Sequence, residues 1–175
     1  MIGARAKGTF YRMHTPRWAS SPTSGAGAAR QGGRANRRGV EALYLSAEYE
    51  TAVDEYRQVS SLMPPGTLVS YDVEIADVAD FREGFDRAAG WAPIWEDFYC
   101  DWRRLAIVEK LEPPSWVVSD LVLQAGLKGI LFPSVARLGG INLVVYPSAL
   151  TPGDKLAAID PRGDLPKDQA SWPAK

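Results

Sequence analysis

The feature that most constrains this chain is a run of glycines and arginines that leads directly into a strand and a helix. Residues 32–39 read Gly-Gly-Arg-Ala-Asn-Arg-Arg-Gly. The apolar run 42–46 follows at once, and then the acid-containing segment 51–55. A glycine-rich loop offers backbone N–H groups, and arginines add fixed positive charge, so the loop suits a phosphate-bearing ligand. The helix that follows can supply one carboxylate for chemistry.

The distribution of charge points to the same end of the chain. Of the 20 Lys and Arg residues, eight lie in residues 1–40, which contain no Asp or Glu. The other 12 bases face 21 acids in residues 41–175. A basic front on a chain of net charge −1 indicates a local anion site or a partner-facing patch rather than a globally nucleic-acid-binding protein. The length of 175 residues predicts one domain.

Cysteine and histidine usage excludes two kinds of site. Cys100 is the only cysteine and His14 the only histidine, so neither an intrachain disulfide nor a Cys/His zinc site can form. The first eight residues lack the apolar core of a signal peptide, and no apolar run approaches the ~20 residues of a membrane helix. We therefore expect a soluble, cytoplasmic protein without a metal.

Hydrophobic periodicity predicts about six short strands and three or four helices. Leu43 and Leu45 are expected on one face of a strand and Tyr44 on the other, with Ser46 capping the next helix. Because the elements follow no regular βαβ order, we expect an α+β fold, with a mixed, largely antiparallel sheet and flanking helices. The strands are expected at 9–13, 40–46, 68–75, 129–132, 141–146 and within 151–160. The helices are expected at 47–58, 95–109 and 115–124, the last of them capped by Ser115, with a turn or short helix at 77–84.

The residues around the candidate motifs do not match three common kinds of site. Residues 25–30 resemble a dinucleotide fingerprint, but they end in Arg30 and no helical pattern follows, so a Rossmann fold is excluded. No Gly-Lys-Ser/Thr closes the loop, which excludes a P-loop nucleotidase. No nucleophile elbow surrounds Ser134, and nothing places His14 beside it, so a Ser-His-Asp hydrolase is not indicated.

The motifs taken together resemble the RES domain, named for an arginine, a glutamate and a serine. The resemblance rests on Gly-Gly-Arg-x-Asn-x-x-Gly, Ala-Leu-Tyr-Leu-Ser, Thr-Ala-x-x-Glu, Gly-x-x-Gly-Ile-Leu-Phe-Pro-Ser and Gly-Gly-Ile-Asn-Leu-Val-Val, in this order. It identifies the three residues as Arg34, Glu55 and Ser134. It covers residues 10–161 of a single domain, 1–175, and leaves 162–175 as a loose tail. The family often has Trp after the arginine, where this chain has Ala35.

The resemblance implies a fold, a substrate and a partner. RES proteins are toxins of bacterial toxin–antitoxin pairs, with an Xre-type DNA-binding antitoxin and a fold similar to ADP-ribosyltransferases. They consume NAD+ as substrate, by phosphorolysis, by hydrolysis or by ADP-ribosyl transfer to a protein, and need no metal. One described member modifies phosphoribosyl pyrophosphate synthetase. The residues do not distinguish a protein acceptor from phosphate or water.

The resemblance also implies roles for the site residues. Glu55 would stabilise the oxocarbenium-like ribose, as carboxylates do in glycosidases, and Arg34 would clamp the pyrophosphate. Nicotinamide is already a cationic leaving group, so no general acid is required. Arg12 or Arg17 would supply a second positive charge. Tyr44 would stack on the nicotinamide ring or form a hydrogen bond with the ribose. Ser134 and Asn142 would orient the nicotinamide end by hydrogen bonds.

A different class of function remains open at this point. The basic front could belong to a non-catalytic module that holds nucleic acid or an acidic partner, with Glu55 as a surface charge. Binding driven by phosphate contacts would weaken steeply as salt rises. The toxin interpretation instead predicts an antitoxin that covers the basic cleft, without direct nucleic-acid or membrane binding by this chain.

Overall fold

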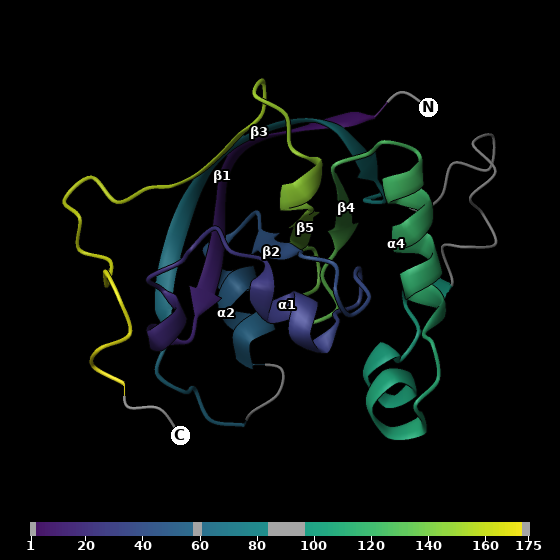
Figure 1. Cartoon of the computed structure of the whole chain (residues 1–175), viewed down its shortest axis with the longest axis horizontal. Coiled ribbons are helices and arrows are strands. Elements are labelled where there is room, and N and C mark those ends of the chain that lie inside the picture. The colour runs from purple at the N-terminus through teal and green to yellow at the C-terminus, as the bar shows by residue number, and fades with distance from the viewer. Residues whose placement is uncertain (1–2, 58–60, 84–96, 173–175) are drawn as a thin grey trace.

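The computed structural model describes residues 3–57, 61–83 and 97–172 (Figure 1). Within these ranges the chain forms one six-stranded sheet with helices around it. The strands are β1 (Ala4–His14), β2 (Leu43–Ser46), β3 (Thr67–Asp80), β4 (Gly129–Pro133), β5 (Ile141–Val145) and β6 (Lys155–Ala158). The helices are η1 (Pro16–Trp18), α1 (Ala26–Gln31), α2 (Tyr49–Arg57), η3 (Arg104–Glu109), α4 (Pro114–Gln124) and η4 (Pro147–Ala149).

The sheet closes on itself. Its strands run in the order β1-β2-β5-β4-β3-β6, and β1 also pairs with β3, so all strands except β6 form a ring. Only the pairing of β3 with β4 is parallel; the others are antiparallel. This confirms the expected α+β class with a mixed, largely antiparallel sheet.

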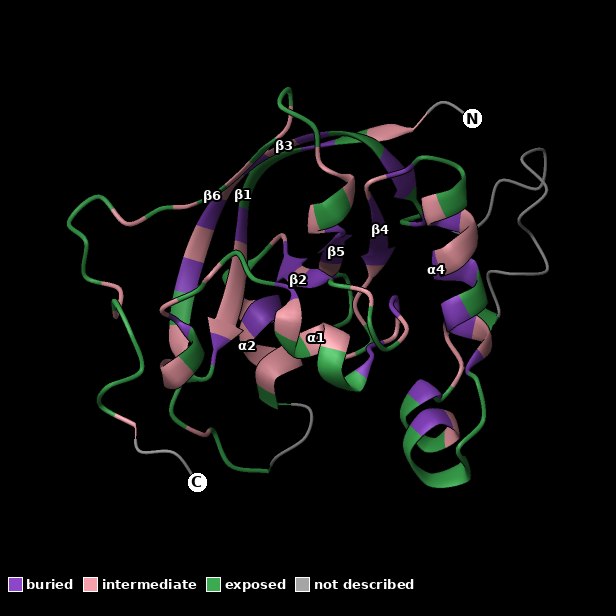
Figure 2. Ribbon diagram, in the orientation of Figure 1, coloured by how far each residue is buried: buried purple, intermediate pink, exposed green. Residues whose placement is uncertain are grey.

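Alternation along the strands divides the apolar residues between two cores. Figure 2 shows buried residues both on the strands and on helix α4. Leu43 and Leu45 join the core enclosed by β1 and β3, whereas Tyr44 packs against the other core, under α4. In β4, likewise, Leu131 belongs to the first core, and Ile130 and Phe132 belong to the second. The period of two therefore confirms the opposite orientation expected for Tyr44 and also sends one face of β2, β4 and β5 toward the helices.

Three local predictions were wrong because tertiary contacts override local pattern. The turn expected over 77–84 begins later: β3 continues to Asp80, since Ala79 and Asp80 pair with β4, and a turn follows at 82–83, while residue 84 lies outside the described residues. Helix α4 has Pro113 at its cap position, so Ser115 lies inside the helix. The hydroxyl of Ser46 donates to Asn142 at 2.8 Å instead of serving α2.

Two further expectations are met in part. Of the helix expected over 95–109, residues 95–96 lie outside the described residues. Residues 97–98 and 102–103 are helical, 99–101 interrupt the helix, and 104–109 form the π-helix η3. Residues 15–40, which their Gly, Ser, Ala and Pro content predicts to be one long loop, contain η1 and α1. The C-terminal segment was expected to be loose from 162, yet Leu165 packs against the core and its N–H bonds Asp160 at 3.1 Å.

Candidate active site

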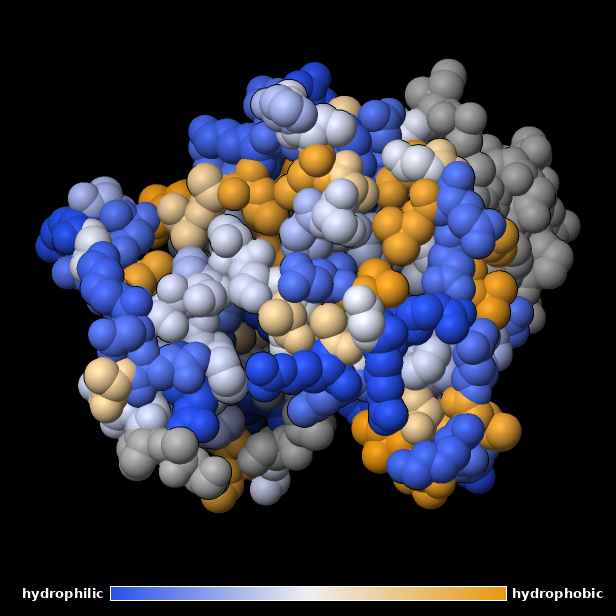
Figure 3. Space-filling view, in the orientation of Figure 1, coloured by the Kyte–Doolittle hydropathy of each residue, from blue (hydrophilic) through white to orange (hydrophobic). Residues whose placement is uncertain are grey.

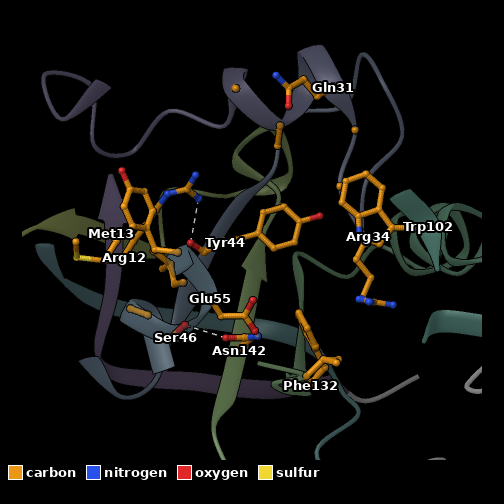
Figure 4. A pocket seen from close by; sticks show the side chains of 18 of the residues that line it. Arg12, Met13, Gln31, Arg34, Tyr44, Ser46, Glu55, Trp102, Phe132 and Asn142 are labelled. Atoms are coloured by element: carbon orange, nitrogen blue, oxygen red, sulfur yellow. Dashed lines mark hydrogen bonds between the residues drawn. The ribbon is translucent and has the colours of Figure 1, made fainter. Parts of the chain in front are cut away.

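A cavity of about 460 Å³ opens between the loop after α1, the ends of β1 and β2, helix α2 and helix η3 (Figure 4). Among the described residues, its charged lining consists of Arg12, Arg34, Arg103 and Glu55, three guanidinium groups against one carboxylate. A volume of this size suits a small organic ligand, and the excess of positive charge favours an anionic one.

Strand register brings several polar side chains to one wall of the cavity. Ser46 on β2 lies opposite Asn142 on β5, and Asn142 lies opposite Phe132 on β4. Ser134 follows β4 two residues after Phe132, and its N–H donates to the Gly140 carbonyl at 2.7 Å. Neighbouring strands thus hold these residues side by side on the face turned to α2.

Glu55 reaches this face from α2 and is held by two hydrogen bonds to the same oxygen. Its Oε1 accepts from the Ser134 hydroxyl at 2.7 Å and from Asn142 Nδ2 at 2.6 Å. Ser134 Oγ in turn accepts from the N–H groups of Ala136 and Arg137, both at 3.1 Å. We call Ser46, Glu55, Ser134 and Asn142 the carboxylate wall.

Arg12 lies on the side of the cavity formed by β1. Its Nη1 donates to the Tyr44 carbonyl at 3.0 Å, and its buried Nε has no hydrogen-bond partner among the described residues. Burial lowers the pKa of Arg12 from its ordinary value, with Tyr71 and Tyr44 acting in the opposite direction. A buried donor without a partner is costly unless a ligand acceptor meets it.

Arg34 lies in the loop 32–39, which we call the arginine wall. Its Nη1 donates to the carbonyls of Phe98 at 2.8 Å and Cys100 at 3.0 Å, and its guanidinium lies 5.6 Å from the centre of the Tyr99 ring. Burial lowers the pKa of Arg34. The side chain therefore lines the cavity and also anchors the segment that leads into η3.

The backbone of the arginine wall is held by side chains that the sequence did not single out. Asn36 is fully buried, and its Nδ2 donates to the carbonyls of Ala28, Arg37 and Val40 at 2.9–3.1 Å. Trp116 Nε1 donates to the Gly33 carbonyl at 2.7 Å, and the Tyr146 hydroxyl to the Ala35 carbonyl at 2.8 Å.

Tyr44 links the two walls. Its hydroxyl accepts from the Ala35 N–H at 2.9 Å and donates to Asn36 Oδ1 at 2.8 Å. Burial raises the pKa of this phenol. Because its single proton is donated to Asn36, Tyr44 has only a ring face to offer a ligand. The approach is tight: a Cβ on Gly33 would lie 2.3 Å from this hydroxyl.

Five of the seven expected site residues line the cavity: Arg12, Arg34, Tyr44, Glu55 and Asn142. Ser134 lies behind Glu55 and bonds it, and Arg17, in η1, is not among the lining residues. The sequence did not point to Trp102, Arg103 or Ser46 in the lining. The guanidinium of Arg103 lies 4.8 Å from the centre of the Trp102 ring. The only sign of this contact in the sequence is that the two residues are neighbours.

Five of the eight basic residues at the front of the chain lie in ion pairs or in the cavity lining. Arg37 forms ion pairs with Glu112 and Asp120, which raise its pKa, and Arg5 and Lys7 pair with Glu74. Arg12 and Arg34 turn into the cavity. This distribution does not support an extended nucleic-acid surface, which would need solvent-facing cations in a row.

Apolar side chains flank the mouth of the cavity on two sides. Ile107, on η3, and Val135, after β4, both line the cavity and are also exposed. Val108 and Leu111, close to Ile107 in sequence, and Leu138, close to Val135 in sequence, are also exposed. Orange side chains gather on the lower right lobe in Figure 3, where Figure 1 shows the helix at residues 104–109.

Two other site types find no support in the described residues. The Nε2 atom of His14 lies 2.5 Å from the Tyr71 hydroxyl rather than beside Ser134. Across residues 3–57, 61–83 and 97–172, no group of His, Cys, Asp and Glu is arranged to hold a metal ion. Within the same part of the chain, no helix has the length and apolarity to cross a membrane.

Comparison with known proteins gives one match in fold and one match to a family model. A solved structure entitled "Crystal structure of the M.tuberculosis MbcT-MbcA toxin-antitoxin complex" has a chain that is similar in fold, with a TM-score of 0.61 and 22% identity. The match covers 91% of this chain and 85% of the other. No curated protein matches the sequence at a significant level. The family model of the RES domain matches residues 9–168, and the chain therefore belongs to the RES family.

Proposed function

We propose that this chain is the toxin of a toxin–antitoxin pair and that it consumes NAD+ by breaking the bond between nicotinamide and ribose. The observation that carries the proposal is the position of Glu55. Ser134 and Asn142 hold its carboxylate on one wall of a cavity whose other walls carry Arg12 and Arg34. A dinucleotide needs this combination, because it presents a pyrophosphate and, some distance away, a ribose that becomes cationic.

The chemistry requires little from the protein beyond charge placement. When the C1′–N bond breaks, its electron pair goes to nicotinamide, which leaves as a neutral molecule, and positive charge develops on the ribose. The Glu55 carboxylate would stabilise that charge and orient the ribose hydroxyls. The acceptor then bonds to C1′; water or a protein side chain loses a proton in this step. No general acid is needed, in agreement with a buried His14 paired to Tyr71.

The remaining side chains divide between binding and positioning. The unpartnered Nε of Arg12 and the guanidinium of Arg34 would donate to the pyrophosphate oxygens. Tyr44 would stack on the nicotinamide ring, since its hydroxyl is engaged with Asn36. Ser134 would act by holding Glu55 rather than by contacting nicotinamide. Arg17, outside the lining, would have no direct contact.

The proposed partner is an antitoxin that covers the cavity. The mouth combines exposed apolar residues, Ile107 and Val135, with three arginines inside. An antitoxin segment with apolar side chains around an acidic residue would complement both features. The solved structure of similar fold is a toxin–antitoxin complex, which supports a partner of this kind, and the family resemblance suggests an Xre-type protein acting with this chain in the cytoplasm.

The test of the chemistry is nicotinamide release from NAD+ by the purified chain. We expect Glu55→Gln to lower the rate by about 10³-fold or more, in the range of removing a main electrostatic stabiliser. Glu50→Gln is the matched control, because Glu50 lies on the same helix but not in the cavity lining. Release that persists in Glu55→Gln would exclude the proposed role of Glu55.

The acceptor can be identified in the same experiment. Release that requires added phosphate indicates phosphorolysis, and release without phosphate indicates hydrolysis. If neither buffer supports release, NAD+ labelled in the ADP-ribose is incubated with cell lysate, where labelling of a protein such as phosphoribosyl pyrophosphate synthetase would indicate transfer. If wild-type protein neither releases nicotinamide nor labels a protein, the NAD+ proposal fails.

A further inference from the structure

Ser46 is a buried polar residue in the cavity lining to which neither the family motif nor the proposed chemistry gives a role. It is the last residue of β2, is 4% exposed, and lies directly opposite Asn142 in the strand register. Asn142 is 6% exposed. Two polar side chains buried side by side in this way need a defined hydrogen-bond arrangement, since an unmatched group would be costly.

The bonds around Asn142 have one consistent direction. The Ser46 hydroxyl donates to Asn142 Oδ1 at 2.8 Å, and Asn142 Nδ2 donates to Glu55 Oε1 at 2.6 Å (Figure 4 draws the first of these). If the amide were rotated by half a turn, its oxygen would face the Glu55 carboxylate, placing two acceptors together. Ser46 therefore fixes the amide from behind, at the atom that Glu55 does not contact.

We propose that Ser46 is a positioning residue for the reaction: it holds the Asn142 amide, which holds the Glu55 carboxylate against the ribose. This inference rests on the proposed NAD+ chemistry. The side chain of Glu55 has several rotatable bonds, and a displacement of about 1 Å at a reacting group can cost 10²-fold in rate. The orientation of the Asn142 amide is fixed only when both its oxygen and its nitrogen are hydrogen-bonded, as they are here to Ser46 and Glu55.

The kinetic test is a double-variant cycle in the nicotinamide-release assay. We expect Ser46→Ala to lower kcat by about tenfold, the rate equivalent of one buried hydrogen bond, with KM nearly unchanged, since Ser46 acts on Glu55 rather than on binding. We expect Asn142→Ala to lower kcat by more, about 100-fold. The double variant should be no slower than Asn142→Ala alone, because Ser46 acts only through Asn142. Independent, multiplicative losses would overturn the proposal, as would an unchanged kcat in Ser46→Ala.

A matched control separates positioning from loss of a buried hydroxyl. Thr51, on α2, is also buried, and its hydroxyl donates to Glu48 Oε2 at 2.9 Å outside the cavity lining. Thr51→Val removes this hydroxyl one helical turn before Glu55. We expect it to keep the wild-type kcat. A tenfold loss in both variants would mean that general disturbance of the fold, not positioning, explains the effect of Ser46→Ala.

A measurement that does not depend on activity keeps the two proposals distinguishable. In a ¹⁵N-labelled sample, the side-chain amide of Asn142 is identified by the signal that Asn142→Ala loses. We expect this amide to exchange slowly with solvent in the wild type, and at least tenfold faster in Ser46→Ala, because its orientation is no longer held. The Thr51→Val sample should match the wild type. If the Asn142 signal is the same in Ser46→Ala, the positioning role is wrong even if nicotinamide is released. If this amide exchanges faster in Ser46→Ala but neither the wild type nor any variant acts on NAD+, then Ser46 does orient Asn142, and only the proposed function fails.

Discussion

The two walls of the cavity are built in different ways. The carboxylate wall consists of side chains on regular elements, β2, α2, the end of β4 and β5, and these side chains bond one another. The arginine wall is a loop whose backbone is bonded by side chains from elsewhere, namely Tyr44, Trp116 and Tyr146, and by its own Asn36.

This difference separates chemistry from stability. On the carboxylate wall, strand register already places Ser46 beside Asn142, so removing one polar group should change the reaction more than the fold. On the arginine wall, the loop belongs to no strand ladder and has its own backbone bridge between Gly33 and Asn36, so removing one side-chain bond should cost stability first and activity as a consequence. Three of the four predictions below each test one side of this contrast, and the third fixes the pH at which the walls can be compared; the expected effects decrease in size.

The largest expected effect is on stability, from Asn36→Ala in the arginine wall. The change removes a fully buried side chain that donates to three carbonyls and accepts from Tyr44. Leaving several buried groups without partners should lower the free energy of unfolding by about 3–4 kcal/mol. Urea denaturation at pH 7 measures it. A loss below about 1 kcal/mol would show that the loop does not depend on this residue.

The next effect is on rate, from Ser134→Ala in the carboxylate wall. Ser134 donates to Glu55 Oε1 at 2.7 Å, and the alanine variant removes this bond while the bond from Asn142 Nδ2 to the same oxygen remains. We expect kcat for nicotinamide release to fall by about 10- to 100-fold, with an unfolding free energy within about 1 kcal/mol of the wild type. If Ser134→Ala instead loses as much stability as Asn36→Ala and keeps its kcat, the contrast between the walls is wrong.

The strands were predictable because their pattern is local. The alternation of Leu43, Tyr44 and Leu45 predicts which side chain faces the helices, and the structure confirms it. The extension of β3 to Asp80 was not predictable, since it depends on pairing with Ile130 and Leu131, about fifty residues away in sequence.

The site was predictable only in part, for the same reason. Glu55 and Ser134 are separated by 79 positions, so no spacing rule joins them, and the family resemblance alone suggested that they meet. Asn36 appeared in the motif without a role. A buried asparagine in a loop has no periodicity to reveal it, and its position between glycines and arginines just before a strand is the signal that could have done so. The role of Trp116 was not predictable either. A tryptophan in an apolar helix is expected to pack in the core, and the sequence gives no sign that its indole N–H donates to the Gly33 carbonyl.

The third prediction concerns pH, which must be controlled in any comparison of the walls. Burial, together with the charge of Arg12, lowers the pKa of His14 from 6.5 to about 3. The native state therefore binds fewer protons than the unfolded chain, so stability is full above pH 6.5 and falls as pH drops toward 3. Between pH 7 and pH 5 we expect a loss of about 2 kcal/mol, at ~1.4 kcal/mol per pH unit below 6.5.

Urea denaturation at the two pH values gives this loss, with His14→Gln as the control that cannot titrate. The variant should be less stable at pH 7, because the contact with Tyr71 is altered, but its stability should change far less between the two values. Equal pH dependence in both proteins would assign the titration to another group. Because β1 carries both His14 and Arg12, the walls should be compared at pH 7 or above.

The smallest expected effect comes from Trp116→Phe, which tests the arginine wall at a single bond. The phenyl ring fills most of the same space, but the N–H that bonds the Gly33 carbonyl at 2.7 Å is lost. Losing one buried hydrogen bond should lower the unfolding free energy by about 1 kcal/mol. Since Gly33 directly precedes Arg34, KM for NAD+ should rise a few-fold while kcat, which depends on the carboxylate wall, stays close to the wild-type value.

Trp18→Phe, at an exposed tryptophan in η1, is the control and should change neither quantity. A fall in kcat with unchanged KM in Trp116→Phe would mean that the two walls act as one unit, and that the division between a binding side and a reacting side does not hold.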